Sequence, residues 1–244
     1  MTFRTPSWSR ACTKRVCIVA ALMVLALILP VGETFAHGIG GKDAAFVAAT
    51  RGPEIIPFLY LGAKHMVTGY DHLLFIVGVI FFLYRLSHVV LYVTMFSIGH
   101  SITLLAGVLF GLHVNPYLVD ALIGLSIVYK AFDNLNGFQT VFGIQPNTKA
   151  AVLGFGLAHG FGLATKLQVL HPSREGLLTN MISFNVGVEL GQILALSVIL
   201  AFIIVWRRTE SFAKYAVLTN VALLAAGFAL TEGQLVSYFT NGRL

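Results

Sequence analysis

Cysteine is almost absent from this chain of 244 residues. The only two, Cys12 and Cys17, lie in an N-terminal segment that we expect to be removed from the mature protein. A mature chain without cysteine forms no disulfide and offers no thiolate to a metal. Any metal site must therefore use nitrogen and oxygen ligands.

Charged side chains are also scarce, at 11% of the sequence, whereas hydrophobic residues make up 57% and the mean hydropathy is +0.84. A water-soluble domain of this length could not bury so much apolar surface in one core. The chain also lacks a basic stripe on a soluble face, which argues against a nucleic-acid partner. The composition predicts an all-α polytopic membrane helix bundle that has the lipid bilayer as its solvent.

The N-terminus has the three parts of a secretory signal peptide. Basic residues occur up to Arg15, an apolar run covers residues 16–29, and residues 34–36 form a cleavage site of the A-x-A type. We therefore expect a signal peptide at residues 1–36 and a single transmembrane helical domain at residues 37–244. An uncleaved signal anchor is the alternative, and both place the start of the mature domain outside the cytoplasm.

Six apolar stretches follow residues 37–64, which we expect to form an extracytoplasmic segment that ends in a short interfacial helix. We place the spans at residues 67–84, 89–110, 117–132, 150–170, 177–205 and 213–230. The third and sixth are short for a full span of about 20 residues. The loops that should face the cytoplasm contain Arg85, His88, Lys130, Lys149, Arg207, Arg208 and Lys214. The sequence thus predicts about six transmembrane helices in the inner (cytoplasmic) membrane of a bacterium, with the mature N-terminus outside.

Small residues at one-turn spacing in the fourth and fifth spans predict close packing between helices. They are Gly154, Gly156, Gly160, Gly162, Gly187 and Gly191. Packing is their default explanation, since glycine lets two helix backbones approach each other.

Ionisable side chains lie inside or at the lip of the predicted spans, where each costs free energy unless it is paired or has a function. They are His65, Asp71, His72, His100, Asp120, His159, Glu189 and Glu232. Neutral imidazoles with carboxylates and without thiolates favour Ni, Co, Zn or Cu(II) over Cu(I), Mg or Ca. The set predicts a site for a borderline transition metal, but does not by itself separate transport from catalysis.

His65 and His72 share one face of a continuous helix but would lie about 10 Å apart along its axis, too far for one small cation to bridge. Either Gly69 breaks the helix and brings His65 back towards His72, or the two histidines are successive stops on a path. Asp71 is rotated by about 100° from His72 and is expected to orient an imidazole on a neighbouring helix. The carboxylate beside the histidines favours a functional role over a purely structural one.

His100 and His159 each have a structural alternative. His100 lies among the hydroxyls of Ser97, Ser101 and Thr103, which either bond it within the core or line a polar route. His159 is flanked by two small residues and is therefore open to adjacent helices, which favours a ligand.

Glu189 shares one helix face with Asn185 and Gln192, at spacings of four and three residues. A carboxylate buried in this long apolar run should pair with a cation or face water. A structural hydrogen bond to Asn185 or His159 is the alternative.

At these residues the sequence resembles the HupE/UreJ family of membrane proteins, over nearly the whole mature chain. The resemblance rests on HMVTGYDHLLF at 65–75, GHSITL at 99–104, GFGLAHGFGLA at 154–164 and FNVGVELGQ at 184–192. The first block fits the family signature H-x5-D-H. That match implies a metal role for His65, Asp71 and His72.

A second family signature, F-H-G-x-A/V-x-G-x-E, is matched only in part. His159 and Gly160 match, whereas Ala158 replaces the aromatic residue and Lys166 stands where glutamate is expected. A lysine is a poor nickel ligand, so Glu189 in the next span is expected to supply the carboxylate. The FNVGVELGQ block is similar to the second branch of the family.

The resemblance implies a secondary permease, not an enzyme, that has a divalent transition-metal cation as its substrate. Nickel is expected first, with cobalt, zinc and copper as alternatives, and the metal would supply maturation proteins of a metalloenzyme such as hydrogenase or urease. The sequence contains no G-x-x-x-x-G-K-[ST] motif, so any coupling to ATP would need another chain. An oligomer is compatible with the sequence, which leaves the number of subunits open.

Two other functions stay open at this stage. An intramembrane zinc hydrolase, similar in outline to membrane ceramidases, would bind zinc through His72, His100 and His159, with Asp71 or Ser101 acting on water. A non-transporting accessory subunit would use the polar residues only to hold the bundle together.

The expected mature N-terminus offers a separate hypothesis. Cleavage before His37 would expose a free amine beside an imidazole, which could capture Ni or Cu at the outer face. The specificity of signal peptidase explains the same position equally well.

Overall fold

A computed structural model describes residues 41–241, and every regular element within that range is a helix. In chain order these are α2 (Gly41–Ala49), α3 (Ile55–Thr68), α4 (Tyr70–Ile80), α5 (Leu86–Phe110), α6 (Pro116–Asn134), α7 (Gly137–Phe142), α8 (Thr148–Val169), α9 (Leu177–Trp206) and α10 (Glu210–Asn241). The predicted all-α helix bundle is confirmed. The predicted signal peptide and His37 lie outside the described residues.

Four helices of the described range are long and apolar enough to cross a membrane, namely α5, α8, α9 and α10. The apolar α4 has only 11 residues, and α6 carries Asp120, Lys130 and Asp133 within its 19 residues. Large apolar side chains such as Ile193, Val198 and Phe202 point outward from α9. An apolar outer surface of this kind suits contact with lipid.

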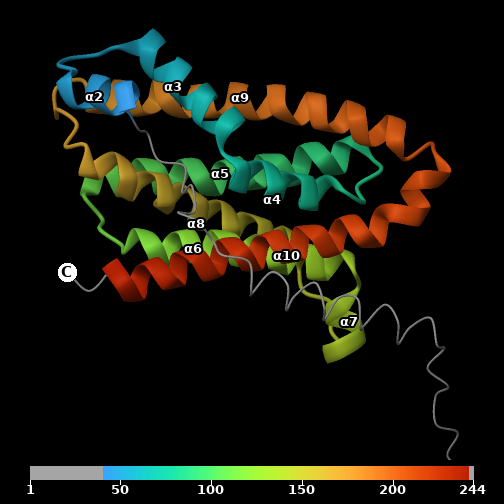
Figure 1. The fold of residues 1–244 in the computed structure, drawn as a ribbon. Coiled ribbons are helices and arrows are strands. Elements are labelled where there is room, and N and C mark those ends of the chain that lie inside the picture. Colours follow the sequence, from blue (N-terminus) through green and yellow to red (C-terminus); the bar gives the residue numbers. More distant parts are fainter. Residues whose placement is uncertain (1–40, 242–244) are drawn as a thin grey trace, which may run out of the picture.

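The first predicted span is interrupted near its start, which the sequence-based boundaries of 67–84 did not capture. Gly69 has an extended backbone, with φ −74° and ψ 95°, and separates α3 from α4. The helix expected to be interfacial is α3, and it packs along α9 instead (Figure 1). The bundle therefore contains an interrupted helix, α3 followed by α4, beside the long α9.

The sixth predicted span, at 213–230, is much longer in the structure, because α10 continues to Asn241. Polar residues lower the hydropathy of its second half, yet Thr231 and Gln234 are buried. The hydroxyl of Thr231 donates to the carbonyl oxygen of Gly227 at 2.8 Å, and its backbone lies close to Gly124 of α6. These polar residues therefore continue the helix against α6 rather than ending it.

The helices pack chiefly in three pairs, α5 with α8, α3 with α9 and α6 with α10 (Figure 1). Each pair has glycine at the contact. A Cβ at Gly99 would lie 2.5 Å from the carbonyl oxygen of Leu153, one at Gly191 would lie 2.6 Å from that of Ala63, and one at Gly227 would lie 2.8 Å from the backbone nitrogen of Val128. The small residues therefore let the backbones approach, as expected for helices in a bilayer.

The glycine prediction holds for five of the six positions. A Cβ at Gly156, Gly160, Gly187 or Gly191 would overlap the backbone of the paired helix, and one at Gly162 would crowd Ile123 of α6. The prediction is wrong for Gly154, since a Cβ there would meet nothing within 4 Å. That glycine faces away from the contact between α5 and α8.

The predicted basic loops lie together at one end of the bundle. The α4–α5 turn with Arg85, the α6–α8 connection with α7, and the α9–α10 turn are at this end, opposite α2 and the last turn of α10 (Figure 1). Arg207 stabilises it by donating to the carbonyl oxygens of Ile80 and Phe81, both at 2.6 Å. That this end faces the cytoplasm stays a prediction from the distribution of charge.

Candidate metal centre

The interruption at Gly69 brings two predicted metal ligands together. His65 lies in the last turn of α3 and His72 in the first turn of α4, and their ring centroids are 5.1 Å apart. On a continuous helix the two side chains would be separated by about 10 Å along the axis. Of the two alternatives that the sequence left open, the structure therefore shows the first.

His72 lies at the centre of four buried imidazoles. Its ring centroid is 5.1 Å from that of His65, 5.7 Å from that of His100 and 4.8 Å from that of His159. The four residues come from α3, α4, α5 and α8, and none is more than 8% exposed. We call these four residues the histidine cluster.

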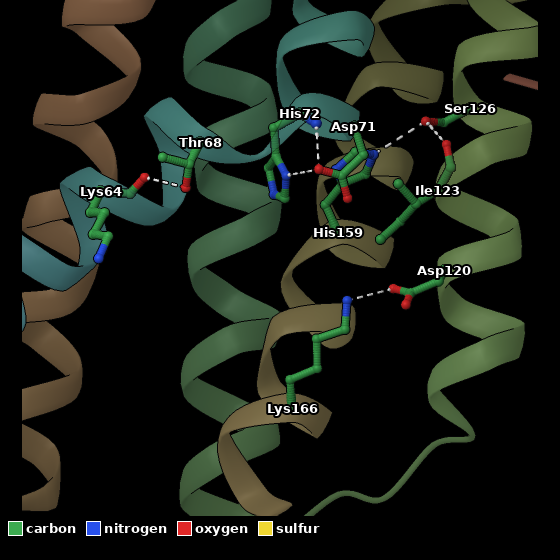
Figure 2. A network of polar contacts seen from close by, with 9 residues as sticks. All are labelled: Lys64, Thr68, Asp71, His72, Asp120, Ile123, Ser126, His159 and Lys166. Carbon is green, nitrogen blue, oxygen red and sulfur yellow. Dashed lines mark hydrogen bonds and ion pairs between the residues drawn. The ribbon is translucent and has the colours of Figure 1, made fainter. Parts of the chain in front are cut away.

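Asp71 fixes the orientation of His72. Its Oδ1 atom lies 2.9 Å from Nδ1 of the His72 ring and also accepts the backbone N–H of His72 at 2.9 Å (Figure 2). Because a carboxylate oxygen accepts, the ring must donate through Nδ1–H, and its Nε2 keeps the lone pair that can bind a metal. The expectation that Asp71 orients an imidazole on a neighbouring helix is wrong: at the start of α4 the carboxylate reaches the adjacent residue.

Ser126 of α6 has the same effect on His159. Its hydroxyl donates to the carbonyl oxygen of Ile123 at 2.6 Å, so the serine oxygen is left to accept from Nε2 of His159 at 3.2 Å (Figure 2). With the proton on Nε2, the free lone pair of His159 is on Nδ1. The serine therefore assigns the tautomer of a second member of the cluster.

Most of the remaining ring nitrogens of the histidine cluster are buried and have no hydrogen-bond partner among the described residues. They are Nε2 of His65 and His72, both ring nitrogens of His100, and Nδ1 of His159. Buried polar atoms normally find a partner, because an unpaired one costs about 1–3 kcal/mol. Several such atoms in one place point to a ligand that satisfies them together.

His65, His72 and His100 are close enough to hold one ion. One ligand nitrogen from each lies within 4.8 Å of the others. Two nitrogens bound to the same ion at about 2.1 Å lie at most about 4.2 Å apart. Small ring rotations would therefore complete a three-nitrogen site, with His159 beside it.

Two of the three hydroxyls that surround His100 in the sequence form hydrogen bonds elsewhere. Ser97 donates to Oε1 of Gln192 at 2.8 Å, and Thr103 donates to the carbonyl oxygen of Leu157 at 2.7 Å. Neither therefore bonds the His100 ring, both nitrogens of which lack a partner. These hydroxyls tie α5 to α9 and α8, and the imidazole stays available.

The comparison with known families bears on this same arrangement. A sequence profile of the family described as HupE / UreJ protein matches residues 41–242, which include the whole histidine cluster. The chain belongs to the HupE/UreJ family. Proteins of this family are linked to accessory functions at the membrane in the use of nickel and cobalt, and the family is not a known family of enzymes. No curated protein and no solved structure matches the chain.

In this HupE/UreJ protein the polar face of α9 contributes mainly to packing. Gln192 accepts from Ser97 and donates to the carbonyl oxygen of Val93 at 3.4 Å, and Asn185 donates to the carbonyl oxygen of Met181 in its own helix. Glu189 is half-buried and does not belong to the group formed by His65, His72 and His100. Its role as a metal ligand stays a prediction.

Lys166, which occupies the place of a family glutamate, lies in the last turn of α8. Its ammonium group forms an ion pair with Oδ1 of Asp120 on α6 at 3.0 Å (Figure 2). Both side chains are largely buried, with 17% and 9% exposed. The lysine that departs from the family pattern is therefore paired with a carboxylate on the neighbouring helix.

The sequence identified the four histidines and Asp71 but missed Ser126. In a span a serine usually bonds a carbonyl oxygen of its own helix, as Ser183 and Ser197 do here. The pattern therefore held no signal that separated Ser126 from the others. Only the packing of α6 against α8 brings its oxygen to His159.

Proposed function

We propose that this chain is a secondary permease that carries a divalent transition-metal cation, nickel first and cobalt second, to supply the maturation of a metalloenzyme such as hydrogenase or urease. The observation that carries the proposal is the group of buried imidazole nitrogens around His72 that have no partner among the described residues. The cation is the substrate of the protein, and the histidine cluster is its binding site.

The chemistry of the ligands supports a borderline metal. Neutral imidazoles bind Ni, Co, Zn and Cu(II) well, whereas Mg and Ca prefer shells made only of oxygen. The hydrogen bonds that His72 and His159 donate to Asp71 and Ser126 direct their lone pairs, as the hydrogen-bond partners of metal-binding histidines commonly do. A site with nitrogen ligands and one adjacent carboxylate therefore favours nickel or cobalt over the alkaline-earth cations.

The broken helix supports transport rather than storage of the metal. Non-helical backbone at membrane depth is tolerated only where it is buried in protein or lines a water-filled cavity. Substrate sites in transporters commonly lie at such discontinuous helices, near the middle of the bilayer. Gly69 is buried between the two histidines that flank the break. A change in the angle between α3 and α4 would alter the distance between His65 and His72 and thereby release the ion.

The membrane potential is a sufficient driving force for uptake. Inward movement of a divalent cation is favoured by about 4–5 kcal/mol per 100 mV. Passage also requires that the site bind the ion only moderately. Three neutral imidazole ligands offer that, because no thiolate and no directly bound carboxylate is needed to hold the ion.

Accumulation of radioactive nickel by cells that express the chain tests this proposal. Cells with the wild-type protein should accumulate nickel above the empty-vector level, and cells with His72→Ala should not. The matched control is His88→Ala, which removes an exposed histidine in the first turn of α5. Equal amounts of each protein in the membrane fraction are required. Accumulation by the His72→Ala variant at the wild-type level would contradict the proposal.

A further inference from the structure

A pair of adjoining cavities lies at the end of the bundle away from Arg85 and Arg207, between the α5–α6 turn and the α8–α9 turn. Their volumes are about 540 and 260 Å³. His113, Gln168 and His171 line both of them. The distribution of charge predicts that this end lies outside the cytoplasm, which is the side from which a metal would enter.

His113 presents one defined nitrogen to the cavities. Its Nδ1 lies 2.6 Å from the carbonyl oxygen of Gly111, so the ring donates through Nδ1–H and keeps its lone pair on Nε2. Gly111 has a left-handed backbone, with φ 64°, and ends α5. The turn that ends the helix therefore also sets the tautomer of the imidazole.

Gln168 presents an oxygen. Its Nε2 donates to the carbonyl oxygens of Gly107 at 2.6 Å and Leu112 at 3.1 Å, which fixes the orientation of the amide because both partners can only accept. The other amide atom, Oε1, is buried and has no partner among the described residues. Gln168 lines both cavities, and its unpaired amide oxygen is available to coordinate a cation once the amide turns towards them.

His171 adopts a backbone conformation that glycine would adopt at lower cost. Its φ is +48°, in the left-handed region, and its N–H donates to the carbonyl oxygen of Gln168 at 3.0 Å. Residues other than glycine are uncommon at such a φ, and strain of this kind gathers at functional sites. An imidazole held there, beside His113 and Gln168, is a third donor at the same cavities.

We propose that His113, Gln168 and His171 form an outer site that captures a divalent transition-metal cation before it reaches the histidine cluster. Its role in uptake rests on the proposed function, but its binding of metal is measurable without transport. Along α8, Gln168 is nine residues from His159, or about 13 Å at 1.5 Å per residue. The outer site is therefore distinct from the cluster and lies on the entry side of it.

The charges around the outer site are consistent with weak, transient binding of the ion. No Asp, Glu, Lys or Arg side chain lines the smaller cavity, and Arg174 lines only the larger one. Two imidazoles and an amide oxygen, completed by water, hold a divalent ion without a compensating negative charge. Binding should therefore be weaker than in the histidine cluster, so that the ion moves inward.

Calorimetric titration of Ni²⁺ into the purified full chain in detergent tests the outer site. In a His100→Ala background, which removes one ligand of the inner cluster, the protein should still bind one equivalent of nickel. His171→Gly should weaken this binding at least tenfold, and His113→Ala together with His171→Gly should remove it. His88→Ala, the matched control at the other end of the bundle, should leave it unchanged.

The His171→Gly variant is expected to stay folded, because glycine suits the backbone at φ +48° and should keep or raise the melting temperature. If it does not, His113→Ala alone carries the test, since His113 is exposed and its truncation should change the stability little. Nickel binding that survives the double substitution in the His100→Ala background would overturn the outer site. So would a His100→Ala protein that binds no nickel at all.

The outcomes also separate this inference from the proposed function. If the variants lose the equivalent of nickel bound at the outer site but keep nickel uptake at saturating concentration, the result supports the outer site and agrees with the proposed permease. Binding that depends on His113 and His171 but not on His72 or His100 would support the outer site and contradict the role of the cluster.

Discussion

At the scale of single residues, Asp71 decides which nitrogen of His72 faces the other imidazoles. The Asp71→Asn variant keeps an oxygen that accepts from Nδ1–H but loses the negative charge that strengthens the ligand. Substitution of a group that accepts a hydrogen bond from a metal-binding histidine typically lowers metal affinity by about 10- to 100-fold. We expect a loss of this size in nickel titrations of the purified protein, with the melting temperature little changed.

The control for Asp71 is Asp43→Asn, since Asp43 forms an ion pair with Lys64 at the bundle surface, at 2.7 Å. It should leave nickel affinity at the wild-type value. An Asp71→Asn protein with wild-type affinity would show that the carboxylate does not tune the histidine.

Ser126 is expected to contribute to the stability of the protein. In Ser126→Ala the Nε2–H of His159 loses its acceptor in the core, and an unsatisfied buried group costs about 1–3 kcal/mol. We expect the free energy of unfolding to fall by that amount in denaturant titrations. Ser197→Ala is the control, because the exposed Ser197 hydroxyl bonds only to its own helix. Equal stability of the two variants would contradict the assigned hydrogen bond.

The residues of the cluster were predictable to the extent that their chemistry is unusual in a membrane. Histidines and an aspartate inside apolar runs are costly, so their presence alone marks His65, Asp71, His72, His100 and His159. What each nitrogen faces depends on packing between helices, and so the partner of Asp71 was predicted wrongly. Ser126 carried no signal, because most serines in spans bond their own helix.

At the scale of helices, the break at Gly69 determines the site. A Cβ at this position would lie 3.0 Å from the carbonyl oxygen of His65 and 3.0 Å from Nδ1 of His72. Alanine also favours a continuous helix over glycine by about 1 kcal/mol. We expect Gly69→Ala to separate the two imidazoles and to abolish nickel uptake, with the helix content by circular dichroism unchanged.

The matched control is Gly154→Ala, which adds a methyl group where nothing lies within 4 Å. It should transport at the wild-type rate, and its greater helix propensity should keep or raise the melting temperature. Wild-type transport by Gly69→Ala would show that the interruption is not needed for binding.

The ion pair between Lys166 and Asp120 joins α8 to α6. Removal of one partner of a buried pair leaves an uncompensated charge and typically costs about 3–5 kcal/mol. Lys166→Met and Asp120→Asn should therefore each destabilise the protein, and the double variant should lose less than the sum of the two. Unfolding in denaturant measures this cycle, with Lys64→Met, in an exposed pair, as a control that should change little. Strictly additive losses would contradict the coupling.

The helices themselves were largely predictable, because the length and hydropathy of a span are set by the bilayer. Five of the six predicted stretches fall on one helix each, the first covers the end of α3 and the whole of α4, and the glycines of α9 mark its contact with α3. The break at Gly69 was only one of two alternatives, since an isolated glycine is often tolerated inside a helix. The length of α10 was missed because hydropathy does not detect polar residues buried against another helix.

At the scale of the whole molecule, the described chain combines three helix pairs with one broken helix that carries two of the four histidines. The outer cavities and the histidine cluster both use α8, at Gln168 and His159. In the proposed function, the ion would move along α8 from the loop ends towards the break at Gly69. The membrane potential alone would then be sufficient to drive a divalent cation along this path.

The order of the helices in space was not predictable from their sequences alone. Apolar stretches report burial in lipid, but the partner of each helix depends on where small residues meet. The glycines of α6 and α10, Gly124 and Gly227, lie at such a contact and carried no distinguishing spacing. The sequence therefore identifies which residues form the candidate site, whereas only the structure shows how they are arranged.

Metal uptake by proteoliposomes that contain only the purified chain tests the central claim most directly. With an inside-negative potential, we predict that nickel enters, that cobalt competes with it and that manganese does not. His72→Ala should abolish entry, and His88→Ala should not. No entry of any metal, with zinc bound tightly to the purified protein instead, would contradict the permease and favour an intramembrane zinc hydrolase.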